Sequence, residues 1–371
     1  MSSDGGGMTQ PTHGGNVYKI ARERRIPLTR IVDFSASINP LGSPVTGLRA
    51  IHSALKQIVH YPDPDCWQLR QALAYRCGVD PDMILVGNGS TELIHLLPRA
   101  LTIKSALIIG PTFEEYARAL LDAGSSVRYV HAGREERFRP PLKEVLRQLS
   151  TKRSRFDAVF LCNPNNPTGQ VMNRLAMRQL AEVVERQQGW LIVDEAFIDY
   201  CQRQSVVSML SEYPRMLLLR SLTKFYAMPG LRIGYLVGAS KAVDRLKDRQ
   251  PPWSVNSLAQ EFSLAVLQDH AYAIKSRIFM KRERSRFMCG LRALSGVHVY
   301  PSAANFVLIE LPTSTSAGEV TDRLAAERLL IRDCSALPGL TAQMIRVAIR
   351  TAKENRLLVA ALGACVRKRR S

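Results

Sequence analysis

Short apolar runs alternate with helical patterns along most of this chain. The runs that match buried strands are residues 83–86, 105–109, 158–161, 190–193, 216–219 and 233–237. Strands that alternate with helices form a mostly parallel sheet with helices on both faces, so the pattern predicts an α/β fold. Each run is followed by Gly, Asn, Asp, Ser or Lys, and ligands of open α/β sheets bind beside the carboxyl ends of the strands. The functional residues are therefore expected in these loops.

A different pattern begins after Pro251-Pro252. A long helical stretch covers residues 256–294, followed by short strands near 297–300 and 306–310, a helix near 317–327 and a strand at 344–349. Since 371 residues are too many for one simple core, we expect a larger domain and a smaller α+β domain. The expected division is a flexible arm at 1–12, an N-terminal segment at 13–40 that packs with the small domain, a large domain at 41–255, and a small C-terminal domain at 256–371 that includes the interdomain helix.

The formal net charge of +19 raises the question of a nucleic-acid partner. The basic residues are spread along the chain, however, and no helix-turn-helix, RNP-type or zinc-finger pattern accompanies them. We therefore expect no nucleic-acid partner. The charge is taken only as weak support for an anionic small-molecule substrate.

No apolar run approaches the roughly 20 residues that cross a bilayer, and the Gly-rich start lacks the apolar stretch of a signal peptide. A cytoplasmic location without a membrane partner is the expectation. The cysteines stand at positions 66, 77, 162, 201, 289, 334 and 365. They form no CxxC pair, which argues against a disulfide framework or a metal site and for reduced thiols.

A glycine-rich segment, Gly87-Asn88-Gly89-Ser90-Thr91-Glu92, follows one apolar run and opens a helical pattern. Backbone N–H groups and the Thr91 hydroxyl at such a helix N-terminus can hold a phosphate. The segment lacks the third glycine of the dinucleotide fingerprint and the GK[ST] of a P-loop. By itself it is therefore equally typical of an ordinary glycine-rich turn.

Two later strand ends carry polar residues. The segment NPNNPTG, residues 163–169, is in one interpretation a turn stiffened by two prolines. An Asn fixed in such a turn can also donate a hydrogen bond to a ligand oxygen. Asp194 ends the next strand, and a buried carboxylate there needs a cationic partner, for which a protonated pyridine nitrogen is suitable.

The segment SLTKFYAMPGLRIGY, residues 221–235, places Ser221, Thr223 and Lys224 in one loop, with Arg232 eight residues beyond the lysine. Burial and nearby positive charge lower the pKa of a lysine, which favours Schiff-base chemistry. A single lysine is more often a surface residue. The four strand ends nevertheless occur in an order that serves one ligand: a phosphate cradle, a ring-oxygen donor, a pyridine-nitrogen acceptor, and a lysine with a phosphate-binding arginine.

The motifs NNPTG, DEAF and SLTK…GLRIGY together resemble the class I/II aminotransferase family of fold-type I pyridoxal-phosphate enzymes, over essentially all of the chain beyond residue 12. The resemblance implies the cofactor pyridoxal 5'-phosphate, bound in the large domain. It implies that Lys224 carries the cofactor, Asp194 pairs with the pyridine nitrogen, Asn166 bonds the ring oxygen O3′, Phe113 stacks on the ring, and Ser90, Thr91, Ser221, Thr223 and Arg232 hold the cofactor phosphate. Tyr61 would reach across from a second subunit to bind the cofactor as well, which implies a homodimer.

Within the family, the segments 13–16 and 33–42 resemble the threonine-phosphate decarboxylase branch more than the histidinol-phosphate aminotransferase branch. So do the segments 220–226, 252–256, 330–334, 338–340 and 346–350. That branch implies a carboxy-lyase that converts L-threonine O-3-phosphate to (R)-1-aminopropan-2-yl phosphate and CO2 in cobalamin biosynthesis. The aminotransferase stays the main alternative. A cofactor-bearing transcription regulator is a distant one, because an arm of 12 residues leaves no room for a DNA-binding domain.

A substrate with both a carboxylate and a phosphate is best matched by arginine side chains. Arg332 and Arg346 are the candidates, although each alone, without the family resemblance, is more typical of a surface or ion-pair residue. The resemblance adds further substrate contacts: His13, Gly14, Ser37 and Asn166. Ser37 stands where the decarboxylase pattern usually has Asn, and Phe197 stands where many aminotransferases have a tyrosine on O3′.

Overall fold

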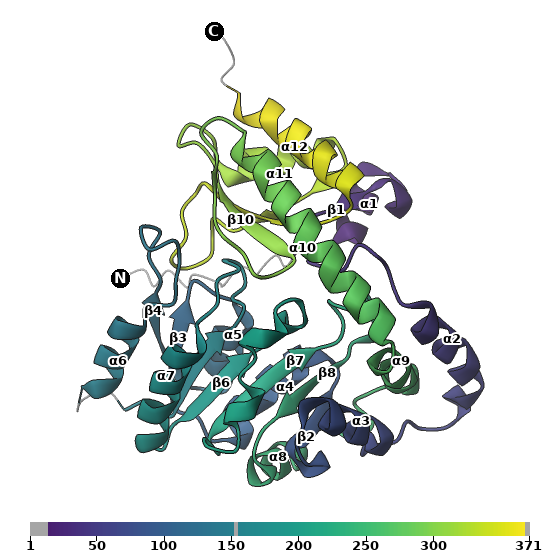
Figure 1. Cartoon of the computed structure of the whole chain (residues 1–371), viewed down its shortest axis with the longest axis vertical. Helices are drawn as coiled ribbons and strands as arrows, with labels where there is room; N and C mark the ends of the chain where they lie inside the picture. The colour runs from purple at the N-terminus through teal and green to yellow at the C-terminus, as the bar shows by residue number, and fades with distance from the viewer. Residues whose placement is uncertain (1–13, 152–154, 368–371) are drawn as a thin grey trace, which may run out of the picture.

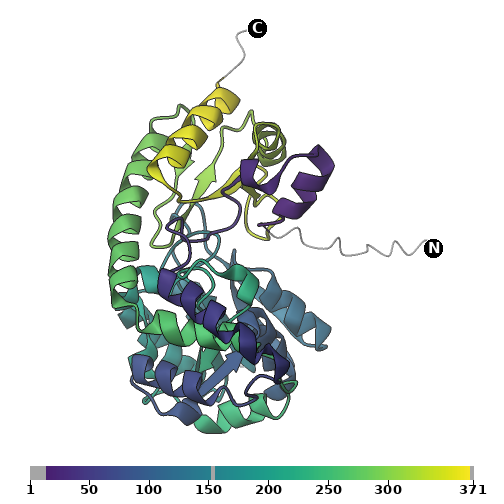
Figure 2. The ribbon, with the colours of Figure 1, turned by 90° about the vertical axis from the view of Figure 1, so that its right-hand side faces the viewer.

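The computed structural model describes residues 14–151 and 155–367, so the arm expected at 1–12 lies outside the described residues. A large unit built around one sheet lies below a smaller unit (Figure 1). The long helix α10 (His270–Arg292) runs from one unit to the other. Viewed from the side, α10 lies along one flank of the molecule, and the two units meet beside it (Figure 2).

The described residues of the large unit form a seven-stranded sheet in the order β2-β8-β7-β6-β5-β3-β4. Its strands are β2 (Ile84–Gly87), β3 (Ser105–Gly110), β4 (Ser126–His131), β5 (Ala158–Cys162), β6 (Trp190–Asp194), β7 (Met216–Ser221) and β8 (Gly234–Val237). β8 runs antiparallel to both of its neighbours, and the other pairs are parallel. The predicted α/β fold with a mostly parallel sheet is confirmed.

Helices cover both faces of this sheet, because the side chains of each strand point alternately to opposite faces. One face buries Ile108 and Phe160 against α4 (Gly89–Ala100), α5 (Glu115–Asp122) and α8 (Ser240–Lys247). The other buries Leu107 and Val159 with α3 (Trp67–Cys77), α6 (Leu142–Ser150), α7 (Arg174–Arg186) and α9 (Ser257–Leu267). α2 (Val45–Ala54) packs on α9.

The edge strand β4 was absent from the expected strands. Its residues are exposed or half-buried except for Val130. The other edge strand, β2, is fully buried and is a continuous apolar run, so the pattern reveals it; β4 is mostly exposed and has no such run, so the same pattern does not reveal it.

The smaller unit contains a sheet in the order β12-β13-β10-β9 and a separate pair, β1-β11. Its strands are β1 (Val32–Asp33), β9 (His298–Val299), β10 (Phe306–Glu310), β11 (Leu329–Leu330), β12 (Arg332–Asp333) and β13 (Met344–Ala348). Its helices are α1 (Val17–Arg24), α11 (Ala317–Ala326) and α12 (Ala352–Val366). Because β1 pairs in parallel with β11, the N-terminal segment lies in this unit. The domain limits at residues 40 and 255 remain a prediction.

The helical stretch expected at 256–294 is two helices. α9 ends at Leu267, and α10 begins after Asp269, whose side chain accepts a hydrogen bond from the backbone N–H of Tyr272 at 2.9 Å. Asp is a preferred residue at this capping position. The expectation also missed α12, although its capping box, formed by Thr351 and Glu354, is a recognisable start signal.

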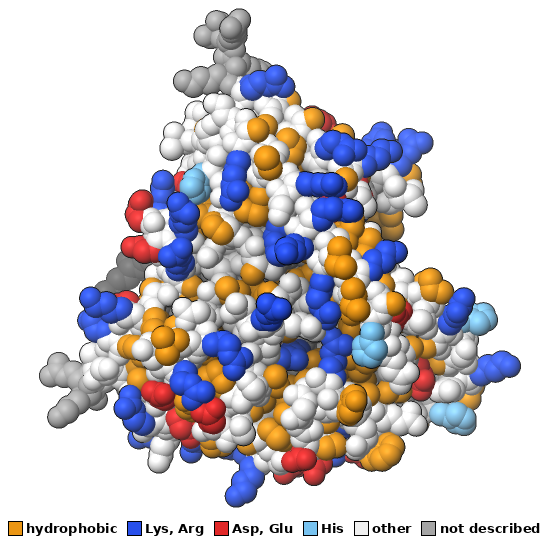
Figure 3. Space-filling model, in the orientation of Figure 1, with side chains coloured by type: hydrophobic (Ala, Val, Ile, Leu, Met, Phe, Trp, Pro, Cys, Tyr) orange, Lys and Arg blue, Asp and Glu red, His pale blue; other side chains and the backbone are white. Residues whose placement is uncertain are grey.

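Basic side chains are scattered over both units on the face shown in Figure 3 and do not gather in one patch. Among the helices of residues 14–151 and 155–367, none combines the length and the apolar character that crossing a membrane requires.

Candidate active site

A cleft of about 690 Å³ lies where the carboxyl ends of β5 and β6 and the loop after β7 face β12 and β13 of the smaller unit. Many of the predicted site residues line it: Gly14, Ser37, Ser90, Thr91, Phe113, Asn166, Asp194, Lys224, Arg332 and Arg346. They come from both units. The fold therefore brings together residues that the sequence spreads over more than three hundred positions.

Lys224 follows β7, and its Nζ donates a hydrogen bond to Oγ1 of Thr223 at 3.0 Å. The hydroxyls of Thr223 and Ser221 are themselves 2.8 Å apart. Burial, together with the positive charge of Arg232, lowers the pKa of Lys224 to about 8. A lysine with such a pKa is partly neutral near pH 7 and can attack a carbonyl carbon.

Asp194 is buried at the end of β6, and one oxygen of its carboxylate accepts a hydrogen bond from the hydroxyl of Tyr116 at 2.5 Å. The other oxygen accepts the backbone N–H of Ala196 at 2.8 Å. Burial raises the pKa of Asp194, although these two hydrogen bonds oppose the shift. A cation beside the carboxylate would complete the site, as a protonated pyridine nitrogen does.

The N-terminus of α4 approaches Arg232 closely. A Cβ atom on Gly89 would lie 2.6 Å from Nη2 of Arg232, and one on Gly234 would lie 2.5 Å from the backbone nitrogen of Ser90. Gly89 also has a φ of +79°, which favours glycine. The backbone at the start of α4 therefore lies close to the Arg232 guanidinium, and Ser90 and Thr91 add hydroxyl groups from the same helix turn, a donor set that fits a phosphate.

The NNPTG loop gives its two asparagines different tasks. Asn165 is buried, and its amide donates 2.8 Å hydrogen bonds to the carbonyl oxygen of Pro111 and to Oγ1 of Thr168, so it holds the loop in shape. Asn166 lines the cleft, and its side-chain oxygen accepts a hydrogen bond from Arg346. Only the second asparagine can touch a ligand.

Arg346 is buried in the cleft wall, where its Nη2 donates to the backbone oxygen of Ser35 at 2.6 Å. Burial lowers its pKa to about 10, and its Nε has no hydrogen-bond partner among the described residues. The hydroxyl of Ser37 is likewise buried without a partner there. Buried polar groups are ordinarily paired, so these two atoms mark a place where a ligand can supply the partner.

Arg332 lies directly opposite Arg346 on the paired strands β12 and β13. Its Nη2 is 3.3 Å from a carboxylate oxygen of Glu114, a residue at the start of α5.

The ring of Phe113 meets that of Tyr116 edge to face, with centroids 5.7 Å apart. Gly14 lines the cleft, whereas His13 lies outside the described residues.

Comparison with known proteins now identifies the family, since residues 29–362 match the family Aminotransferase class I and II. The chain belongs to this family. It is 39% identical over 352 residues to the threonine-phosphate decarboxylase of Salmonella typhimurium, covering 94% of this chain and 95% of that protein. The predicted family and branch resemblance are confirmed.

Two solved structures show the same architecture. L-threonine-O-3-phosphate decarboxylase from Porphyromonas gingivalis has a TM-score of 0.80 at 29% identity, over 90% of this chain and 99% of that one. Histidinol-phosphate aminotransferase from Clostridium acetobutylicum has a TM-score of 0.83 at 30% identity, over 89% and 98% of the two chains. The fold that the class I and II aminotransferase motifs imply is therefore present throughout.

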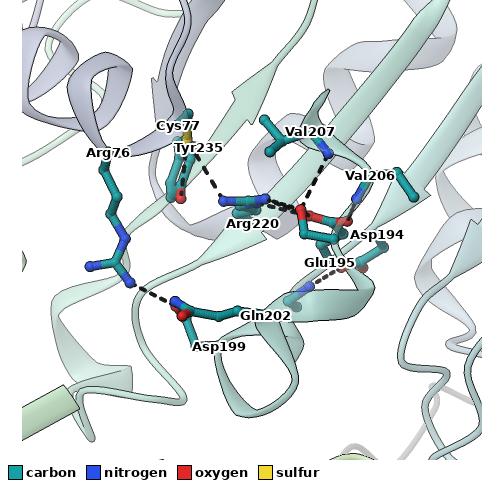
Figure 4. A network of polar contacts seen from close by, with 12 residues as sticks. Arg76, Cys77, Asp194, Glu195, Asp199, Gln202, Val206, Val207, Arg220 and Tyr235 are labelled. Atoms are coloured by element: carbon teal, nitrogen blue, oxygen red, sulfur yellow. Dashed lines mark hydrogen bonds and ion pairs between the residues drawn. The ribbon is translucent and has the colours of Figure 1, made fainter. Parts of the chain in front are cut away.

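In this aminotransferase-family chain, a polar network surrounds Glu195, the neighbour of the cleft residue Asp194 (Figure 4). Glu195 accepts hydrogen bonds from Nη2 of Arg220 at 2.7 Å, from Oγ of Ser205 at 3.0 Å and from the backbone N–H of Val206 at 2.8 Å. Its side chain is 0% exposed and that of Arg220 is 11% exposed. Asp194 and Glu195 are adjacent, so this network fixes the strand end that presents Asp194 to the cleft.

Among the described site residues that were predicted, Ser221, Thr223 and Arg232 do not line the cleft itself, and Tyr61 lies away from it. Its side chain is 79% exposed, and its ring stacks on that of Trp253 with the centroids 4.6 Å apart. Within one chain it therefore does not reach the site.

The sequence interpretation missed Tyr116 and Glu114. Both belong to the segment GPTFEEY, residues 110–116, of which only Phe113 was assigned a role. The signal available was position: this segment follows β3, and so it starts at the same sheet edge as the other site loops.

Proposed function

We propose that the chain decarboxylates L-threonine O-3-phosphate to (R)-1-aminopropan-2-yl phosphate and CO2 with pyridoxal 5'-phosphate, as a step of cobalamin biosynthesis. The observation that carries this proposal is one cleft that holds Lys224, with its lowered pKa, and two neighbouring arginines, Arg332 and Arg346. Two cations match a substrate with a carboxylate and a phosphate. The 39% identity to the Salmonella enzyme supports the same reaction.

The donors around the cleft fit the cofactor. Asp194 would bind the pyridine nitrogen, Asn166 the ring oxygen and Phe113 the ring face, while the phosphate would be bound by Ser90, Thr91, Ser221, Thr223 and Arg232. When bound, the cofactor supplies a π-system that accepts the electron pair left at Cα as CO2 departs. The buried Asp194 carboxylate keeps the pyridine nitrogen protonated and so strengthens that electron sink.

The residues of the chain decide which bond at Cα breaks. Arg346 and the Ser37 hydroxyl bind the substrate carboxylate, and Arg332 binds the phosphate, so the substrate is fixed at both ends. Lys224 then donates a proton to Cα as general acid, which its pKa of about 8 permits near neutral pH. An aminotransferase would instead direct the Cα–H bond to the base.

The assembly is also a proposal: two copies form a homodimer in which Tyr61 of each reaches the other's cleft. Large apolar side chains that are exposed in the single chain support it: Val45, Leu48, Leu55, Ile58, Val59 and Tyr61. Exposed apolar patches of this kind mark interfaces. Sedimentation of the purified protein as a dimer, and loss of affinity for pyridoxal phosphate in Tyr61→Ala, are the expected results. A monomer with full activity would contradict the assembly.

The remaining proposals concern location and partners. We propose a cytoplasmic enzyme that acts on a small phosphorylated amino acid, without nucleic-acid or membrane partners. The cysteines among the described residues are all free, which supports a reducing compartment.

The deciding experiment mixes the holoenzyme with L-threonine O-3-phosphate in the absence of any oxo acid and follows CO2 together with the cofactor absorbance. Sustained CO2 release with an unchanged cofactor spectrum is expected. Conversion of the cofactor to pyridoxamine phosphate without CO2 would favour the alternative, a histidinol-phosphate-type aminotransferase, since the chain also resembles the Clostridium enzyme of that name. Lys224→Ala is the control that should abolish either reaction.

A further inference from the structure

Two arginines of the cleft stand side by side with different partners. Arg332 and Arg346 are directly opposite each other across β12 and β13, and both line the cleft. Cβ atoms of such a pair lie about 4.5–5.5 Å apart, so the two positive charges repel each other unless anions lie nearby. What each guanidinium contacts therefore decides what it can bind.

Neutral oxygens hold Arg346, whereas a carboxylate holds Arg332. Arg346 donates to the side-chain oxygen of Asn166 and to the backbone oxygen of Ser35. These contacts orient the guanidinium without neutralising it. Arg332, in contrast, pairs with Glu114 at 3.3 Å. For an anionic substrate, the charge of Arg346 is therefore not neutralised, whereas Arg332 is already paired with a carboxylate.

The contact between Arg332 and Glu114 has the geometry of a weak ion pair. It is a single contact, longer than the roughly 2.8 Å typical of a charge-assisted hydrogen bond. The two side chains are 14% and 25% exposed, so water reaches the pair. A phosphate carries up to two charges and can bind a guanidinium at two points, which this carboxylate does not do here.

The pair also joins the two units across the cleft. Glu114 stands at the start of α5 on the large unit, and Arg332 belongs to β12 of the smaller one.

Asn166, which contacts Arg346, is a predicted ligand of the cofactor ring. A carboxylate on Cα therefore belongs beside Arg346, and a phosphate farther along the substrate belongs at Arg332.

We propose that Glu114 competes with the phosphate of the substrate for Arg332. The pair opens when the phosphorylated amino acid binds, and it forms again as the phosphorylated product leaves. This inference rests on the proposed function, in which the carboxylate is lost and the phosphate is kept. Because substrate and product present the same phosphate, a tight phosphate contact would bind both equally and slow product release. Because the Glu114 carboxylate competes for Arg332, it weakens the binding of the product phosphate.

The test uses the holoenzyme and Glu114→Gln, which keeps the side-chain size and removes the charge. We expect KM for L-threonine O-3-phosphate and the inhibition constant of (R)-1-aminopropan-2-yl phosphate to fall by the same factor, about two to five, the effect of one partly exposed ion pair. The inhibition constant of L-threonine, which has no phosphate, should change less than twofold. Unchanged constants for both phosphorylated compounds would overturn the proposal.

Two variants serve as controls. Glu212→Gln removes a carboxylate from a surface pair with Arg178, whose side chains are 47% and 42% exposed, and should leave every constant unchanged. Glu114→Asp keeps the charge on a shorter side chain and should fall between the natural protein and Glu114→Gln. An effect of Glu212→Gln equal to that of Glu114→Gln would show general electrostatics and overturn the competition.

A binding measurement separates this inference from the proposed function. Inorganic phosphate is titrated into the holoenzyme by calorimetry, with no turnover needed. Tighter binding to Glu114→Gln and weaker binding to Arg332→Gln support the competition even if the chain does not decarboxylate. Equal binding to all three proteins, in an enzyme that does release CO2, would sink the competition and leave the function intact.

Discussion

Asp194 and Glu195 are neighbours in sequence but belong to two regions of opposite character. Around Glu195 the polar groups are paired within the protein, with Arg220, Ser205 and a backbone N–H converging on one carboxylate. On the cleft side, buried atoms such as the Ser37 hydroxyl lack partners among the described residues. A fully paired network supports the fold, whereas a buried region short of partners is prepared for a ligand.

The largest expected effect breaks the supporting region. Glu195→Ala leaves the buried guanidinium of Arg220 without its carboxylate, and the free energy of unfolding should fall by about 3–5 kcal/mol. Urea denaturation followed by circular dichroism measures it. Glu212→Ala, which breaks an exposed pair, should cost less than about 1 kcal/mol. Equal losses in the two variants would erase the contrast between the regions.

In the cleft, Arg346→Met should separate stability from activity. Burial already lowers the pKa of Arg346 to about 10, which shows that the fold disfavours the charge, so the stability of the variant should stay within about 1 kcal/mol. The loss of charged hydrogen bonds to the substrate should reduce kcat/KM by about 100-fold. Steady-state kinetics and urea denaturation on the same preparation provide the comparison. A large loss of stability in this variant would mean that Arg346 stabilises the fold, as the residues around Glu195 do.

A smaller, pH-dependent effect concerns Lys224. Because its pKa is lowered from 10.5 to about 8, the reactive neutral amine should appear as the pH rises through about 8, well below the range of an ordinary lysine. Uptake of pyridoxal phosphate by cofactor-free protein, followed by absorbance, should at pH 7 have about one tenth of its plateau rate. Lys224→Arg should show no uptake. A midpoint near 10 would mean that the cleft does not shift this amine.

The smallest effect is expected from Ser37→Ala. The hydroxyl makes no hydrogen bond within the described residues, so its removal should change the free energy of unfolding by less than about 0.5 kcal/mol. The substrate would lose one neutral contact, and KM should rise about threefold. A large loss of stability would show that Ser37 supports the fold and does not await a ligand.

The sequence revealed the parts of the site that follow inner strands. Asp194 and Lys224 could be predicted because apolar runs mark β6 and β7, and the polar residues that follow each run lie at the carboxyl ends of the strands. The position of Tyr116 and Glu114 after β3 was a usable signal, but their pairings with Asp194 and Arg332 could not be predicted, because these partners are 78 and 218 residues away in the chain. Pairings over such distances depend on packing that no local pattern records.

The start of the described chain and its last strand build one wall of the cleft together, for Arg346 bonds to Ser35 across 311 residues. The cleft residues of the large unit, from Ser90 to Lys224, lie between Ser35 and Arg346 in the sequence. During synthesis the cleft residues up to Lys224 are thus complete on the ribosome before the wall that needs Arg346. A message cut short ahead of codon 346 would encode a chain that keeps Lys224 and Arg332 but lacks Arg346, the guanidinium proposed to bind the carboxylate of the substrate.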